Sequence, residues 1–353
     1  MTDNSSSPPL VDKARLKQVG KKVTEFLEPE NLHEGGWLKL LAIVVIGILL
    51  LTLLFSILWS REPALFDVGV AAKIRMEQNE HADVIGYTTT NTLIEVASTL
   101  LTKSGGYISN DRIPPGIFMD NIANWEWGVL QQVRDFTGAL RNDFSRAPTI
   151  YTENEDLTLA HPKFNVDNTS WMVPSAESEY WTGIEYVENY LNDLGTGRAQ
   201  FYARADNLRD WLKVVGRRLE SLSQRLSASL GSAQPTADED GNSKKSQLSE
   251  IQSQTPWFEI DDVFYEARGT SWALLHLLRA IEVDFNDLLQ KRGALASLQQ
   301  IIRKLEATQS TIWSPMILNG SEFGIFANHS LVMSSYISNA SNGINGLRDL
   351  LLK

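Results

Sequence analysis

The sequence of 353 residues contains no cysteine. Its absence excludes disulfide bonds, zinc sites with cysteine ligands, iron–sulfur clusters and cysteine nucleophiles. A chain without thiols suits an oxidising compartment such as a periplasm, although the lack of cysteine does not by itself fix the compartment. At this length, and with 43% hydrophobic residues, the chain can bury a large core in one or two domains.

The sequence motifs of common enzyme classes are absent as well. No phosphate-binding loop, dinucleotide-binding glycine pattern, nucleophile elbow or zinc-protease helix occurs. The histidines are scattered, none at ligand spacing from another, at His33, His81, His161, His276 and His329. His276 lies among leucines in the strongest helical pattern, where a structural histidine is the favoured interpretation. The sequence therefore predicts no catalytic residue, no metal and no cofactor.

The chain also lacks an excess of basic charge. Its net charge is −11, and the six basic and six acidic residues of positions 1–59 cancel, so the negative excess falls on the remainder. A nucleic-acid partner requires a basic face that neutralises phosphates. We therefore expect no nucleic-acid partner.

One long hydrophobic run stands near the N-terminus. From Leu40 to Leu58, nineteen residues carry no charge and fifteen of them are Leu, Ile, Val or Phe. Trp37 and Trp59 bracket the run, as aromatic belts do at membrane interfaces. A core helix is rarely apolar on every side, and a signal peptide has a shorter apolar region. The run predicts a retained transmembrane helix over residues 37–59, with the lipid bilayer as its partner.

The distribution of basic residues around this run predicts its orientation. Five basic residues and Lys39 precede the apolar centre, whereas Arg61, Lys73 and Arg75 follow it. The excess favours residues 1–36 as a cytoplasmic tail and a C-terminal domain on the other side. We therefore expect a single-pass protein of the bacterial inner membrane with a periplasmic domain. Within the tail, residues 12–27 fit either an amphipathic helix on the membrane surface or a disordered basic segment.

The remainder of the chain shows helical periodicity. Apolar residues recur at spacings of three and four across residues 60–230 and again across residues 257–353. The pattern in residues 257–353 predicts a helical hairpin followed by a C-terminal helix. We expect these helices to pack on the helical region formed by residues 60–230. Residues 231–256 are rich in Ser, Gln, Asp and Glu and contain no aromatic residue, which predicts a disordered linker. The fold class expected is all-α, an elongated antiparallel helical bundle after one transmembrane helix.

Residues 146–174 interrupt the helical periodicity. They contain three prolines and two alternating pieces, at 149–152 and 157–160, which are typical of a small β-hairpin near 149–160. A long irregular segment within a compact domain is usually either functional or disordered. His161 and Trp171 lie in this segment and are therefore predicted contact residues.

Several acidic residues lie at the start of the segment with the clearest helical periodicity. Glu259, Asp262 and Glu266 fall at i, i+3 and i+7, on one helix face, and with Asp261 they could bind a cation. A solvated acidic face beside an apolar seam explains the pattern better. We therefore interpret these carboxylates as contact residues and not as metal ligands.

Two stretches carry a resemblance to a known family. They are Trp59-Ser60-Arg61-Glu62-Pro63 after the apolar run, and residues 257–269, which read WFEIDDVFYEARG. They resemble a family of bacterial inner-membrane proteins of unknown function. The resemblance implies one N-terminal anchor followed by one helical domain, and it implies no activity.

Two functions fit these observations. The first is a non-enzymatic envelope scaffold or adaptor whose helical domain binds another envelope protein or a second copy of itself. The alternative is an enzyme or binding module that acts on a cell-wall or lipid component, with a site in residues 146–174. A deep polar pocket with converging carboxylates would favour the enzyme, and a flat apolar or acidic face would favour the scaffold.

Overall fold

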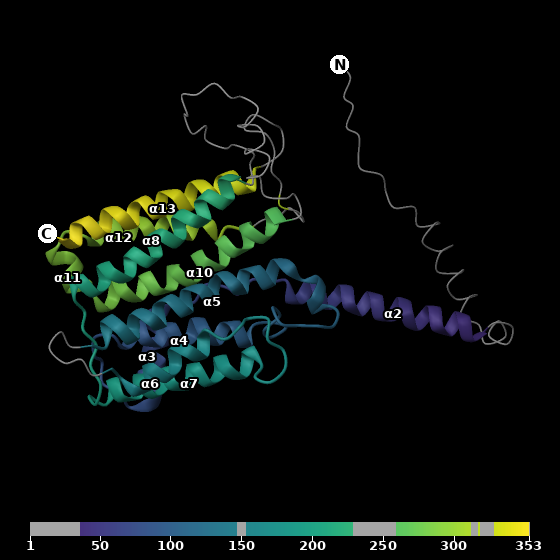
Figure 1. Ribbon diagram of the computed structural model, residues 1–353, viewed down its shortest axis with the longest axis horizontal. Helices are drawn as coiled ribbons and strands as arrows, with labels where there is room; N and C mark the ends of the chain where they lie inside the picture. The colour runs from purple at the N-terminus through teal and green to yellow at the C-terminus, as the bar shows by residue number, and fades with distance from the viewer. Residues whose placement is uncertain (1–35, 147–152, 229–258, 312–316, 318–327, 353) are drawn as a thin grey trace, which may run out of the picture. The chain divides into compact units, whose positions relative to one another are not determined.

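The computed structural model describes residues 36–146, 153–228, 259–311, 317 and 328–352, and the chain forms two compact units, Met1–Phe55 and Ser56–Lys353. Throughout these described stretches the regular elements are helical, which confirms the predicted all-α class (Figure 1). The helices are α2 (Gly36–Trp59), α3 (Val68–Asn79), α4 (Tyr87–Thr102), α5 (Asp120–Ala139), α6 (Glu155–Phe164), α7 (Ala176–Gly195), α8 (Ala205–Ala228), α10 (Ile260–Asp284), α11 (Asn286–Lys291), α12 (Leu295–Thr308) and α13 (His329–Leu352). Two short turns of other helical type are η2 (Gly116–Phe118) and η3 (Leu140–Phe144), the latter a π-helical turn.

Helix α2 is the apolar helix that the sequence predicts. Its large apolar side chains are exposed from Trp37 to Leu58. Within the described part of the chain, it is the one helix long and apolar enough to cross a membrane. The amphipathic helix proposed for residues 12–27 lies outside the described residues.

Helix α10 is the centre of the second unit and contacts α3, α4, α5, α8, α12 and α13. Figure 1 shows α8, α12 and α13 gathered on one side of α10, and α3, α4, α6 and α7 beyond α5. The helical seams predicted from the sequence face this core. Leu208, Leu212, Val215, Leu219, Leu222 and Leu226 of α8 are buried, as are Ile337, Ala340, Ile344, Leu347 and Leu351 of α13. The linker predicted for residues 231–256 lies outside the described residues.

The expected antiparallel arrangement applies to α10 with α12, but not to α10 with α5. Asn124 donates to Asp262 across 2.6 Å where α5 and α10 begin, and the rings of Phe144 and Phe285 lie 5.7 Å apart beyond their ends. The two helices therefore run in the same direction. Gly128 and Gly269 permit their close approach, because a Cβ at either position would collide with the backbone of the other helix.

The β-hairpin expected near 149–160 is wrong for the described residues, since residues 155–164 form α6. Asn154 caps this helix by accepting from the backbone N–H of Leu157 across 3.1 Å. Glu155 and Asp156 in the first turn favour a helix N-terminus electrostatically. These local signals outweigh the alternation of residues 157–160; residues 147–152 lie outside the described part of the chain.

Candidate functional site

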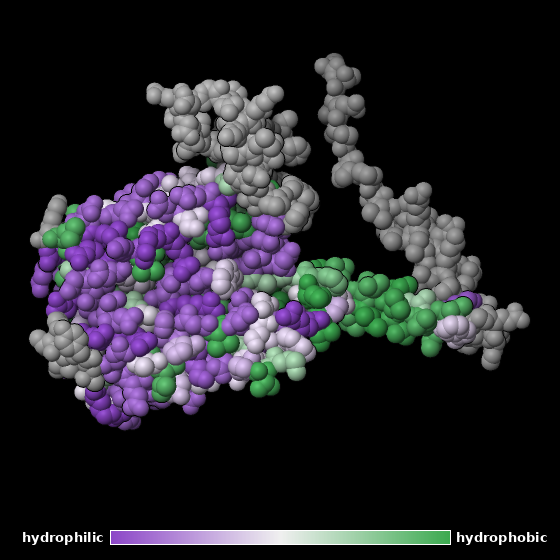
Figure 2. All heavy atoms as spheres, in the orientation of Figure 1, coloured by the Kyte–Doolittle hydropathy of each residue, from purple (hydrophilic) through white to green (hydrophobic). Residues whose placement is uncertain are grey.

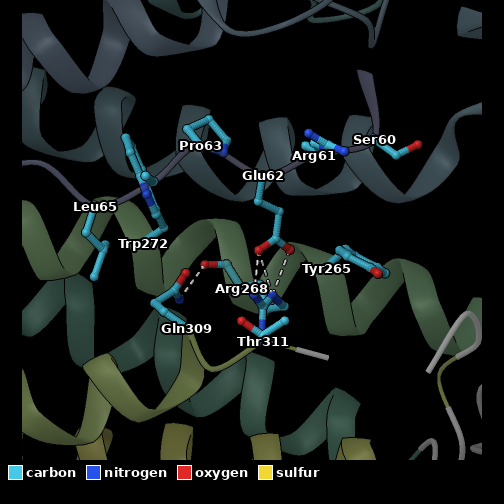
Figure 3. Close-up of a pocket in the computed structure, with 11 residues that line it drawn as sticks. Ser60, Arg61, Glu62, Pro63, Leu65, Tyr265, Arg268, Trp272, Gln309 and Thr311 are labelled. Atoms are coloured by element: carbon cyan, nitrogen blue, oxygen red, sulfur yellow. Dashed lines mark hydrogen bonds and ion pairs between the residues drawn. The ribbon is translucent and has the colours of Figure 1, made fainter. Parts of the chain in front are cut away.

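The segment that follows α2 is bound firmly to α10. Within this exit segment, residues 60–67, the carboxylate of Glu62 accepts from Arg268 Nε across 2.7 Å and from Arg268 Nη2 across 2.5 Å (Figure 3). The side chains are 18% and 7% exposed. A bidentate pair fixes both position and orientation, and breaking a buried pair by removing one partner typically costs about 3–5 kcal/mol.

The same guanidinium also binds the end of α12. Arg268 Nη1 donates to the carbonyl oxygens of Thr308 and Ser310 across 2.9 and 3.0 Å. Gln309 donates back to the carbonyl of Arg268 across 3.2 Å. Arg268 therefore joins the exit segment, α10 and the residues after α12.

His276 provides the second attachment of the exit segment. The backbone N–H of Phe66 donates to His276 Nε2 across 3.1 Å, and Nδ1 lies 2.7 Å from the carbonyl oxygen of Trp272. Because Nε2 accepts, the ring is neutral and its proton is on Nδ1. Burial lowers the pKa of His276 to about 4. The stacked Phe66 ring, 4.0 Å from the imidazole centroid, contributes to this burial.

A cavity of about 510 Å³ lies between the exit segment and α10. Figure 3 shows its lining residues, with Tyr265, Arg268 and Trp272 from α10 facing residues 60–65. The charged groups at its floor, Glu62 and Arg268, neutralise each other. The arrangement can hold a segment of chain in place, and it offers no unpaired acid and base for proton transfer.

The predicted acidic residues lie together at the start of α10. Glu259 is exposed, Asp262 accepts from Asn124, and Glu266 forms a bidentate pair with Arg225 across 2.5 and 2.7 Å. Burial raises the pKa of Asp262 to about 6, and repulsion from Asp120, Asp261, Glu259 and Glu266 adds to the shift. We call these four carboxylates, together with Asp262, the acidic face. In the described part of the chain, no group of three His, Asp or Glu residues has an arrangement that could hold a metal ion.

His161 lies in α6 beside a second cavity, of about 250 Å³. Its lining includes the carboxylates of Asp135, Asp143 and Asp210 and the guanidinium of Arg134. Arg218 neutralises Asp135 through hydrogen bonds of 2.5 and 2.8 Å. Burial is the main cause that lowers the pKa of His161, which favours the neutral imidazole.

Trp171 lies apart from this cavity, in the connection between α6 and α7. It is 56% exposed, beside the equally exposed Met172 and Val173. The connection is held to the one before α5, because Asn110 donates to the carbonyl oxygen of Ser170 across 2.9 Å. The structure therefore does not combine His161 and Trp171 into one site.

Sequence reasoning missed the pair of Glu62 and Arg268. The two residues are separated by 206 positions, and no spacing rule connects them. Both lie in the stretches that carry the family resemblance, Glu62 in WSREP and Arg268 in residues 257–269. Their position in these two stretches was the one signal in the sequence that could have pointed to the pair.

The fold and the exit segment define a class: an all-α chain with one N-terminal helix long and apolar enough to span a membrane, joined directly to a large helical unit. The chain belongs to the family described as "Uncharacterized protein conserved in bacteria (DUF2333)", which matches residues 32–353. No curated protein and no solved structure matches the chain.

Proposed function

We propose that this chain is a membrane-anchored envelope scaffold or adaptor whose helical unit binds another envelope protein or a second copy. The acidic face carries the proposal. Burial is the main cause of the raised pKa of Asp262, and repulsion from the neighbouring carboxylates adds to it, while Arg225 pairs with Glu266. A cationic surface on a partner would relieve this repulsion, so association is favoured there by charge complementarity.

The exit segment supports the same proposal. Glu62 and Phe66 are fixed to Arg268 and His276, so the helical unit is already ordered in its first residues after Trp59. Binding costs less conformational entropy when the surface is already ordered.

We place the protein in the bacterial inner membrane, with residues 1–36 cytoplasmic and the helical unit periplasmic, because basic residues precede the span. A reporter that is active only in the periplasm, fused after residue 353, is expected to give signal. A silent fusion, together with an active cytoplasmic reporter at the same point, would reverse the orientation.

Site-specific photocrosslinking in cells tests the contact surface. A photoreactive amino acid at Glu259, on the acidic face, is expected to give an adduct with one envelope protein or with a second copy. The matched control is Gln290 in α11, which is equally exposed and lies beyond the other end of α10. Glu259→Gln with Asp262→Asn should reduce capture from a neighbouring exposed position in a graded, salt-dependent way, as rim charges do. Equal adducts from Glu259 and Gln290 would refute the acidic face as the contact surface.

The alternative function, an enzyme or binding module for a cell-wall or lipid component, is favoured by a specific observation. The cavity at His161 is also lined by Asp143 and Asp210, and the lowered pKa of His161 favours the neutral imidazole that can act as a general base. Burial and repulsion from Asp210 raise the pKa of Asp143 above its usual range. His161→Ala separates the two functions, because an active site would lose its activity and a scaffold would keep its contacts.

A further inference from the structure

Two loops of the helical unit expose large apolar side chains side by side. In the connection between α4 and α5, Ile113, Ile117 and Phe118 are 75%, 54% and 73% exposed. In the connection between α6 and α7, Trp171, Met172 and Val173 are 56%, 61% and 97% exposed. We call these six residues the apolar loop pair. The other exposed apolar residues of the unit are mostly isolated, and the face of the unit in Figure 2 is predominantly hydrophilic.

Hydrogen bonds hold the two loops together. Asn110 donates to the carbonyl oxygen of Ser170 across 2.9 Å and to the carboxylate of Glu177 across 2.6 Å. Arg112 donates to the carbonyl oxygen of Thr169 across 3.2 Å. Figure 1 shows both connections at the same end of the helical unit. The exposed apolar side chains of the two loops therefore form one surface, which these hydrogen bonds hold in place.

The surface lies at the end of the unit where the chain leaves α2. Trp59, the last residue of α2, covers Gly105, where a Cβ would lie 2.6 Å from the indole. The residues after Gly105 are fixed by Glu126, which accepts from the backbone N–H groups of Ile108 and Ser109 across 2.9 and 2.8 Å. Glu126 is itself paired with the buried Lys103 across 2.7 Å. Trp59 and the residues that lead to the loop pair therefore pack together within the helical unit.

We propose that the apolar loop pair inserts into the lipid surface of the membrane that α2 spans. Trp and Phe side chains prefer the interface between headgroups and acyl chains, and burial of exposed apolar area there is favourable. Trp59, a residue type that prefers the interface, packs on Gly105 within the helical unit, close to the residues that lead to the loop pair. Arg61, two residues after Trp59, is exposed, and its guanidinium can pair with the phosphates of lipid headgroups. This contact gives the helical unit a second attachment and a defined orientation on the bilayer.

Environment-sensitive fluorophores test the proposal on the full chain. The native sequence has no cysteine, so each of Val173→Cys, Ile113→Cys, Ile85→Cys and Leu50→Cys carries one label. Ile85 is the matched control, since it is 59% exposed and precedes α4 at the opposite end of the unit. Leu50 reports on the span itself. Each variant is placed, one chain per disc, in lipid nanodiscs with nitroxide groups near the top of the acyl chains.

The label at Val173 or Ile113 is expected to shift its emission to the blue and to lose intensity to the nitroxide, as the label at Leu50 does. The label at Ile85 should keep its emission. Quenching at Leu50 without quenching at Val173 and Ile113 would overturn the lipid contact and leave the anchor standing. Quenching at none of the positions would remove the anchor as well. A blue shift at Val173 that appears only with two chains per disc, without quenching, would assign the surface to a second copy.

Discussion

At the scale of single residues, His276 links the stability of the helical unit to pH. Its folded pKa of about 4 lies below the 6.5 of an unfolded histidine, because burial disfavours the imidazolium. The neutral His276 therefore contributes fully to the stability of the folded protein above pH 6.5, and this contribution is lost as the pH falls toward 4. Protonation of Nε2 would also turn the acceptor for Phe66 N–H into a donor.

We predict that wild-type protein loses about 3 kcal/mol of unfolding free energy between pH 7 and pH 4 through this group. His276→Gln replaces the imidazole with a side chain that does not titrate. The variant should therefore lose correspondingly less unfolding free energy over the same pH interval. Urea denaturation of the full chain in detergent, followed by tryptophan fluorescence at the two pH values, measures the difference. Equal losses of unfolding free energy in the wild type and the variant would contradict the conclusion that His276 is neutral and hydrogen-bonded in the folded protein.

The structural role of His276 could be predicted from its apolar neighbours, but its partner could not. Phe66 lies 210 positions earlier in the chain, and its contribution is a backbone N–H, which every residue other than proline has. Glu62 and Arg268 were missed for the same physical reason. Long-range polar contacts depend on which helices become neighbours, and local periodicity does not contain that information.

At the scale of the helices, the pairing of α5 and α10 depends on two glycines. At Gly269 an added Cβ would overlap the carbonyl oxygen of Trp125, and at Gly128 it would lie 2.6 Å from the backbone nitrogen of Thr270. Neither obstacle is the flexible end of a side chain, so the helices would have to separate. This pair makes the most extensive contact between helices in the described chain.

We predict that Gly269→Ala destabilises the protein by about 3 kcal/mol through overpacking. The control is Gly346→Ala in α13, where an added Cβ meets nothing within 4 Å. That change should be neutral or stabilise by up to about 1 kcal/mol through helix propensity. Both are measured as shifts of the urea midpoint at constant m-value. A stable Gly269→Ala variant would mean that α5 and α10 are less closely packed than the structure shows.

Helical periodicity predicted most elements but not how they pair. The stripes of α8, α10 and α13 follow spacings of three and four, because one face of each helix is buried. In α6 the alternation of residues 157–160 and the nearby prolines suggested strands, whereas Asn154 and the two acidic residues after it were the better signals. The parallel direction of α5 and α10 was not predictable, since periodicity gives the buried face of a helix and not its direction.

At the scale of the whole molecule, different parts of the chain have different properties. The apolar helix α2 has the composition of an anchor, the exit segment is fixed to α10, and the acidic face is the contact surface that we propose for a partner. The acidic pattern was visible in the sequence as i, i+3, i+7 spacing. The contribution of Asp120 from α5 was not, because it depends on the pairing with α10.

The proposed scaffold works by contact and not by chemistry, and substitution of His161 tests this proposal most directly. The measurement is complementation of a strain that lacks the gene by full-length His161→Ala, with membrane level and folding checked alongside. We expect complementation at the wild-type level, whereas Glu259→Gln with Asp262→Asn should complement only in part. Complete loss of function in His161→Ala, at normal membrane level and with photocrosslinking from Glu259 unchanged, would contradict the account and assign an active site to the cavity of Asp143 and Asp210.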